Sequence, residues 1–153
     1  MFRSVTKLFK STEHPKPEKH RAHIVIADDD ATDLRMIEYC IRREFKNIDI
    51  VKLKEYGEFL DYFADLRSKR IPAPSIAFID AKMKGMSGLD FIRMLKMTVP
   101  KCEACLQSDH INRYKMEKDI ISKTHKVDYV LPKETNFTGL LKRLHEHLNA
   151  LHA

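Results

Sequence analysis

The sequence predicts an α/β fold in which a five-stranded parallel sheet is covered by helices on both faces. Short apolar segments rich in Val and Ile alternate with longer segments whose apolar residues recur at helical spacing. Most of the strand-like segments are apolar throughout, which is typical of strands buried on both faces of a parallel sheet. This regular alternation of strand and helix indicates successive β-α-β units.

The first half of the predicted sheet begins after Pro15 and Pro17, where the character of the sequence changes. Residues 23–27 are apolar and rich in β-branched side chains, so we expect a buried strand there. A helix follows, and the alternating residues 48–53 then indicate a second strand and a second helix with one apolar face. The residues that mark the two helices are Leu34, Ile37, Ile41 and Phe45, then Tyr56, Phe59, Leu60 and Phe63.

The second half is predicted to contain three more strands. Two prolines break the chain before an apolar strand at residues 76–79, which ends on Asp80. A weaker strand signal lies around residues 104–106, and the last strand is expected at residues 129–131. Thr135 or Asn136 is expected to open the last helix as its N-cap. The three helices of this half are expected through Leu89, Ile92 and Leu95, over residues 111–123, and through Leu140, Leu141, Leu144, Leu148 and Leu151.

The length of 153 residues, with 43% hydrophobic and 33% charged residues, fits one globular domain. We expect this domain to cover residues 22–153 and residues 1–21 to form a flexible basic tail. The tail holds six of the 28 Lys and Arg residues but two of the 22 acidic ones, so most of the net charge of +6 lies outside the domain. No nucleic-acid-binding motif is visible, and DNA binding is not expected.

Apolar residues at positions 2, 5, 8 and 9 give the tail helical spacing. Such a segment can touch a membrane, but a disordered tail or a helix packed on a neighbouring chain is the preferred interpretation. The sequence has no apolar run of about 18 residues and no secretion signal. An odd number of cysteines favours a reducing cytosol, so we expect a cytoplasmic location. Cys102 and Cys105 form a C-x-x-C without a second ligand pair, which favours ordinary thiols over a metal or redox site.

Polar residues follow the predicted strands at the points where the strands end. The carboxyl ends of parallel strands meet at one edge of the sheet, so these side chains are expected to share a crevice. They are Asp28, Asp29 and Asp30 after the first strand, Asp80 after the third, Gln107 and Ser108 after the fourth, and Lys133 after the fifth.

This set of residues fits phosphoryl transfer. Clustered carboxylates repel one another unless a cation neutralises them, and oxygen ligands suit Mg²⁺, which also coordinates phosphate. Lys133 adds a fixed positive charge, and a carboxylate can itself be the nucleophile. A single Asp after a strand is usually a turn residue or a helix cap. The prediction therefore depends on the acidic cluster, the single Asp80, the hydroxyl and the Lys occurring at successive strand ends.

Three stretches at these strand ends resemble those of response-regulator receiver domains, the CheY-like phospho-acceptor domains of two-component signalling. They are residues 24–30 with their acidic end, residues 80–89 with Met, Met and Gly at set offsets from the Asp, and residues 130–133. The resemblance covers about residues 22–150. It implies a flavodoxin-like, doubly wound sheet and a stand-alone regulator that is phosphorylated in a phosphorelay by a histidine kinase or a histidine phosphotransfer protein. Such a domain signals through protein contacts and is not an enzyme beyond its own phosphorylation and dephosphorylation.

Carried over position by position, the resemblance implies that Asp80 accepts the phosphoryl group. Asp29 would bind Mg²⁺ directly, Asp28 would bind it through water, and the backbone carbonyl of Lys82 would be a further ligand. Lys133 would contact the phosphoryl oxygens. The side chain of Lys82 could also cover the phosphoryl group, although solvent exposure is the commoner outcome for such a Lys.

Several positions depart from the family pattern. Lys84 stands where Pro is usual. The switch hydroxyl is ambiguous: Gln107 takes that place if Leu106 is the last core residue of its strand, and Ser108 takes it if the strand runs one residue further. Burial of an amide inside a strand is costly, which favours Gln107 at the switch position. The position of the switch aromatic residue holds Val130, with Tyr129 one place away.

Two other functions remain open. Residues 28–32 also fit the D-x-D-x-T nucleophile motif of haloacid-dehalogenase-like phosphatases, with Asp28 as nucleophile and Asp30 as acid/base. That class needs a further acidic pair after its Lys, and here only Glu134 and Glu146 follow. The second alternative is a receiver-like module that binds a partner without being phosphorylated, which the departures at Lys84, Gln107 and Val130 would favour.

In the family that this chain resembles, the fourth helix, the fifth strand and the fifth helix form the readout surface. With no output domain in the sequence, the signal would pass to an unidentified protein or through a homodimer on this face. The dimer is the weaker prediction, because the leucines of the last helix are expected to be mainly core. The basic residues expected on the readout surface are Arg113, Lys115, Lys118 and Lys142.

Overall fold

The computed structural model describes residues 21–109 and 126–151. Residues 1–20 of the expected tail, and the helix expected at residues 111–123 with its basic side chains, lie outside the described residues. The described elements, in chain order, are β1 (Ala22–Ala27), α2 (Ala31–Glu44), β2 (Ile48–Leu53), α3 (Tyr56–Arg67), β3 (Ile76–Asp80), α4 (Gly88–Thr98), β4 (Glu103–Ser108), β5 (Tyr129–Pro132) and α7 (Thr138–Leu151).

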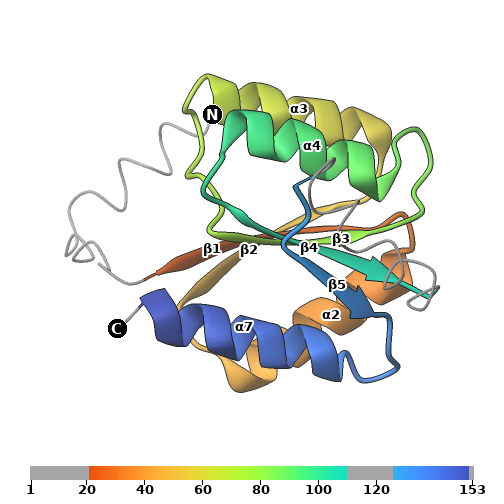
Figure 1. Ribbon diagram of the computed structural model, residues 1–153, viewed down its shortest axis with the longest axis vertical. Coiled ribbons are helices and arrows are strands. Elements are labelled where there is room, and N and C mark those ends of the chain that lie inside the picture. The colour runs from red at the N-terminus through yellow and green to blue at the C-terminus, as the bar shows by residue number, and fades with distance from the viewer. Residues whose placement is uncertain (1–20, 110–125, 152–153) are drawn as a thin grey trace, which may run out of the picture.

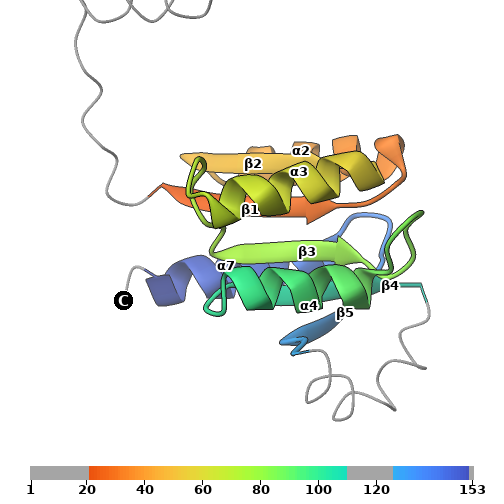
Figure 2. The ribbon, with the colours of Figure 1, turned by 90° about the horizontal axis from the view of Figure 1, so that it is seen from above.

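The strands form one parallel sheet in the order β2-β1-β3-β4-β5. Helices α3 and α4 cover one face, and α2 and α7 cover the other (Figure 1). The view from above shows the same layers (Figure 2). The predicted fold class is confirmed. Because the chain leaves β1 toward the face covered by α2 and leaves the neighbouring β3 toward the face covered by α4, a crevice opens beyond the carboxyl ends of β1 and β3.

The inner strands send alternate side chains into two separate apolar cores. Ile79 packs beneath α3 and α4, where Phe59 and Phe91 meet edge to face with their ring centroids 5.4 Å apart. Phe78 packs on the opposite face with Leu144 of α7. All five side chains are fully buried. The strand ends that carry the predicted site are thus held by packed layers on both sides.

The last helix begins later than predicted. It starts at Thr138, and Phe137 precedes it with a φ of 53° while its carbonyl accepts the first helical hydrogen bond from Leu141. The N-cap expected at Thr135 or Asn136 is therefore wrong by one or two residues. The reason is packing, because the Phe137 side chain is buried in the core beside α7.

Cys102 and Cys105 are both buried, and they pack into the two different cores on opposite faces of the sheet. Burial also raises the pKa of the Cys102 thiol to about 12. The two sulfurs therefore do not face a common ligand, as expected for ordinary thiols. In the parts of the chain that the structure describes, no helix has the length and apolar character needed to cross a membrane.

Candidate functional site

The sequence-predicted carboxylates meet at the carboxyl end of the sheet. Asp28 and Asp29 directly follow β1, and Asp80 is the last residue of β3. One carboxylate oxygen from each of the three lies within 4.8 Å of the others. Asp28 and Asp80 are buried, and Asp29 is half-buried. Three carboxylate oxygens gathered in this way are a donor set that fits a hard divalent cation.

Lys133 extends into the same cluster from the end of β5. Its Nζ lies 2.8 Å from Asp28 Oδ2 and 3.3 Å from Asp80 Oδ1. The backbone holds it there, because the Lys133 N–H donates a hydrogen bond to the carbonyl of Ser108 at the end of β4. The structure therefore brings together the four charged residues that the sequence placed in one crevice, which are Asp28, Asp29, Asp80 and Lys133.

The cluster contains one residue that the sequence analysis missed. Asp33, in the first turn of α2, has its Oδ2 2.8 Å from Lys133 Nζ. The sequence did contain a hint of this position, because α2 starts three residues after Asp28 and its first turn must therefore lie near the end of β1. An acidic residue in a first helical turn has an ordinary explanation in the helix dipole, so the sequence alone did not single it out.

The third acid of the triplet has a structural role. The Asp30 side chain accepts hydrogen bonds from the backbone N–H groups of Thr32 and Asp33, at 2.8 and 3.1 Å, and so caps the start of α2. Its own N–H donates to Asp28 Oδ1 at 2.9 Å. Asp30 is exposed and engaged in capping, and this use weakens the phosphatase interpretation, which needs it as an acid/base.

The loop after Asp80 is held against the cluster by two backbone features. Gly88 opens α4 so close to β3 that a Cβ there would lie 2.2 Å from the carbonyl oxygen of Asp80, so no other residue fits without movement. The Lys84 N–H donates to Asp29 Oδ2 at 3.1 Å. A proline at position 84 would have no N–H to donate. Lys82 lies exposed in the same loop, and metal binding by its carbonyl remains a prediction.

The sheet register places the two candidates for the switch position on opposite faces of β4. Gln107 pairs with Asp80 across β3 and β4, so the two side chains lie next to each other on one face. The Gln107 side chain is buried, and its Nε2 has no hydrogen-bond partner. Ser108 pairs one step further on, with Pro132, and its side chain alternates to the other face. Of the two candidates, Gln107 is therefore the one whose side chain lies beside Asp80.

Val130, at the aromatic switch position, and its neighbour Tyr129 point to opposite faces of the sheet. Val130 packs against the core under α3 and α4, and Tyr129 against the opposite core. The guanidinium carbon of Arg143 lies 4.2 Å from the centre of the Tyr129 ring. The one aromatic residue near this position is therefore held against α7 by a cation–π contact.

The electrostatics follow from burying several acids around one base. Burial, and then the negative charge of Asp28, raise the pKa of Asp80 to about 6, and Lys133 only partly opposes this. Burial also raises the pKa of Asp28. For Lys133, burial alone would lower the pKa, but its contacts with Asp28, Asp33 and Asp80 together outweigh burial and raise it. Added positive charge would thus stabilise the cluster.

Several solved structures with the same fold are receiver domains. A CheY-like receiver domain protein from Methanospirillum hungatei is 20% identical, with a TM-score of 0.67 over 84% of this chain and 94% of that chain. A receiver domain protein from Clostridium thermocellum is 19% identical, with a TM-score of 0.67 over 86% and 97%. The response regulator TrrA from Thermotoga maritima, in complex with Mg²⁺ and beryllofluoride, is 18% identical, with a TM-score of 0.65 over 82% and 98%.

No protein-family model and no curated protein matches the sequence. At these identities the likeness establishes the fold. The chain thus has the CheY-like receiver fold over most of its length, with an acidic cluster and a lysine at the carboxyl end of the sheet.

Proposed function

We propose that this chain is a response-regulator receiver domain that receives a phosphoryl group on Asp80. The observation that carries the proposal is the contact of 3.3 Å between Lys133 Nζ and Asp80 Oδ1, at the edge of the three-carboxylate cluster. It provides a nucleophilic oxygen, a cation for the phosphoryl oxygens and ligands for a metal within one crevice. The same crevice lies in a fold that is shared with receiver domains.

In the proposed reaction, an oxygen of the Asp80 carboxylate attacks the phosphorus of a phosphohistidine. The P–N bond breaks, and its electron pair leaves with the imidazole of the donor. Lys133 neutralises charge on the phosphoryl oxygens. Water later attacks the same phosphorus, which releases phosphate and restores the carboxylate. Asp28, Asp29 and Asp80 would hold Mg²⁺, which supplies positive charge to the phosphoryl oxygens when bound.

Gln107 has a specific part in this proposal. An unpaired amide donor that is buried costs free energy in the resting protein. A phosphoryl group on the neighbouring Asp80 would bring acceptor oxygens to this donor. We therefore assign Gln107 to the phosphoryl-binding position that the family fills with a hydroxyl, and Ser108 to the small-residue position that follows.

The donor would be a histidine kinase or a histidine phosphotransfer protein, and the signal would pass by protein contact within the cytoplasm. Phosphorylation would shift an existing equilibrium between two surface arrangements. The proposal includes no turnover of other substrates and no DNA binding. Lys142, exposed on α7, is the described member of the predicted basic readout surface.

The test is incubation with acetyl phosphate and Mg²⁺, followed by intact mass measurement. The wild type is expected to gain the mass of one phosphoryl group, and Asp80→Asn is expected to gain none. Asp61→Asn, which changes an exposed acid on α3, is the matched control and should be labelled like the wild type. An unlabelled wild type that also fails to bind beryllofluoride would support the interaction module that is not phosphorylated. Hydrolysis of p-nitrophenyl phosphate that survives Asp80→Asn would support the phosphatase.

A further inference from the structure

Lys133 is fully engaged before any phosphoryl group arrives. An ammonium group has three N–H donors, and Lys133 Nζ lies within 3.3 Å of three carboxylates, those of Asp28, Asp33 and Asp80. Its side chain is 13% exposed, so water contributes little to its hydrogen bonding. A phosphoryl oxygen can therefore gain the ammonium only by taking the place of one of these partners.

The three partners are not equivalent. Asp80 becomes the phosphorylated residue, and Asp28 belongs to the group of carboxylates that could hold a metal ion. Asp33 does not belong to that group. It is the most exposed of the three, at 31% of its side chain, and it lies on the first turn of α2 where water can solvate it. Asp33 is thus the partner that can be released from Lys133 at the lowest desolvation cost.

We propose that Asp33 competes with the phosphoryl group for Lys133 and so weakens the phosphorylated state. This inference depends on the proposed function, because it concerns the same site. The Asp33 carboxylate opposes phosphoryl binding in two ways. It holds part of the Lys133 ammonium that the phosphoryl oxygens would use, and its negative charge repels the incoming anion. The phosphorylation site of this chain is therefore adjusted by an acid outside its metal-binding group.

The test is the affinity for beryllofluoride, a phosphoryl mimic, in saturating Mg²⁺. Binding is followed by the fluorine NMR signal of the bound form. Asp33→Asn keeps the shape of the side chain and removes its charge, and it is expected to bind beryllofluoride about threefold to tenfold more tightly. This difference should shrink as salt is added, because the site opens to solvent and the charge is screened.

Asp90→Asn is the matched control. Asp90 also lies in the first turn of a helix, α4, and pairs with Arg93 on its own helix at 2.8 Å. The two variants change the net charge and the helix dipole interaction equally, so only a local contact with Lys133 distinguishes them. Asp90→Asn is expected to bind beryllofluoride like the wild type.

The outcomes separate this inference from the proposed function. If the wild type binds beryllofluoride and Asp33→Asn binds it equally or more weakly, the competition is wrong and the proposed function stands. An equal gain in Asp90→Asn would also overturn the competition, because net charge would then explain the effect. If neither the wild type nor any variant binds beryllofluoride, the proposed function itself fails. Thermal unfolding of each variant without ligand confirms that it is folded.

Discussion

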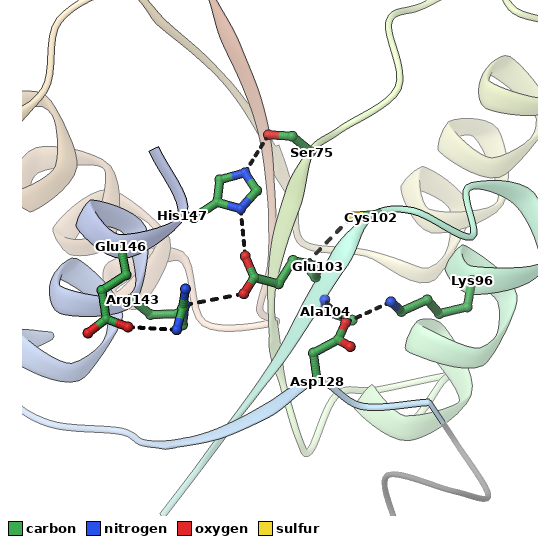
Figure 3. A network of polar contacts seen from close by, with 9 residues as sticks. All are labelled: Ser75, Lys96, Cys102, Glu103, Ala104, Asp128, Arg143, Glu146 and His147. Atoms are coloured by element: carbon green, nitrogen blue, oxygen red, sulfur yellow. Dashed lines mark hydrogen bonds and ion pairs between the residues drawn. The ribbon is translucent and has the colours of Figure 1, made fainter. Parts of the chain in front are cut away.

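Both ends of the sheet carry a cluster of polar side chains around a buried titratable group, but the two clusters balance their charges differently. The carboxyl-end cluster comprises Asp28, Asp29, Asp33, Asp80, Gln107 and Lys133. The amino-end cluster comprises Ser75, Glu103, Arg143, Glu146 and His147, and it joins the starts of β3 and β4 to α7 (Figure 3).

The amino-end cluster is nearly satisfied. His147 contacts Glu103 through Nδ1 at 2.5 Å and Ser75 Oγ through Nε2 at 2.9 Å. Arg143 contacts Glu146 at 2.7 Å, and its Nε lies 3.3 Å from Glu103 Oε1, an ion pair without the geometry of a hydrogen bond. Two carboxylates therefore face a guanidinium and an imidazole. Such a network holds α7 against the sheet.

The carboxyl-end cluster is unbalanced. Three carboxylates contact one ammonium group, a fourth, that of Asp29, lies beside them, and the pKa of Asp80 is raised by burial and repulsion. The Gln107 amide nitrogen lacks a hydrogen-bond partner. Each cluster thus contains one buried nitrogen without a hydrogen-bond partner, Gln107 Nε2 or Arg143 Nε, but an excess of acids over bases is found at the carboxyl end alone of the two. Unbalanced charges and unpaired polar groups are expected at functional sites, where some stability is given up for ligand binding.

The largest effect on stability is expected at the amino end. His147→Ala removes a buried side chain with two hydrogen bonds, and it should lower the free energy of unfolding by about 2–4 kcal/mol in urea titrations. His145→Ala on the same helix is the control. His145 is 53% exposed and pairs with Glu44, so its loss should cost less than about 1 kcal/mol. Beryllofluoride affinity should stay unchanged in both variants, and a loss in folded His147→Ala would connect the amino end to the functional site.

At the carboxyl end, removing a charge should stabilise the protein. At pH 7, Asp80→Asn is expected to raise the free energy of unfolding by roughly 1–3 kcal/mol, since burial and repulsion disfavour the ionised acid. The folded pKa of about 6 lies above the ordinary value of 3.8. The ionised Asp80 therefore destabilises the fold fully above pH 6, and this penalty disappears as the pH falls through 6 toward 4.

The measurement is the difference in unfolding free energy between wild type and Asp80→Asn across pH 4 to 8, without Mg²⁺. The gain should be largest above pH 6 and vanish near pH 4. A destabilised variant at pH 7 would mean that Lys133 already compensates for Asp80, and the contrast between the two ends would be lost.

The comparison also shows what the sequence could predict. The order of strands and helices, and the meeting of Asp28, Asp29, Asp80 and Lys133, follow from periodicity and from the rule that parallel strands end at one edge. Contacts that depend on exact side-chain geometry did not follow. Asp33 resembles any first-turn acid, and only its placement over β1 brings it to Lys133.

The exact strand register and the packing at the start of α7 could not be predicted from the sequence either. The choice between Gln107 and Ser108 depends on a one-residue register, which the pairing of Asp80 with Gln107 supplies. The late start of α7 depends on the burial of Phe137, which a cap rule based on Thr and Asn does not include. The amino-end cluster joins residues far apart in the chain, and no motif indicates it.

A smaller gain in stability is expected at Gln107. Gln107→Leu keeps a similar volume and removes the unpaired donor, so it should raise the free energy of unfolding by about 1–2 kcal/mol. The same change should weaken beryllofluoride binding about fivefold, because a hydrogen bond to an anion is lost. Gln107→Thr restores a donor and should recover part of the affinity. If Gln107→Leu leaves the affinity unchanged, Gln107 does not contact the phosphoryl group.

The smallest expected effect concerns the metal. In the resting site the Lys84 N–H donates to Asp29 Oδ2, so a cation that binds Asp29 must compete with this hydrogen bond. Lys84→Pro removes the donor and should increase the affinity for Mg²⁺ about threefold, since this hydrogen bond is exposed to solvent and is worth about 1 kcal/mol or less. Mg²⁺ titrations followed by the rise in Tm measure this affinity. Lys84→Ala keeps the backbone N–H and removes the same side-chain charge, so it should bind Mg²⁺ about as the wild type does. Equal affinities for Lys84→Pro and Lys84→Ala would show that the hydrogen bond from the Lys84 N–H to Asp29 does not compete with metal binding.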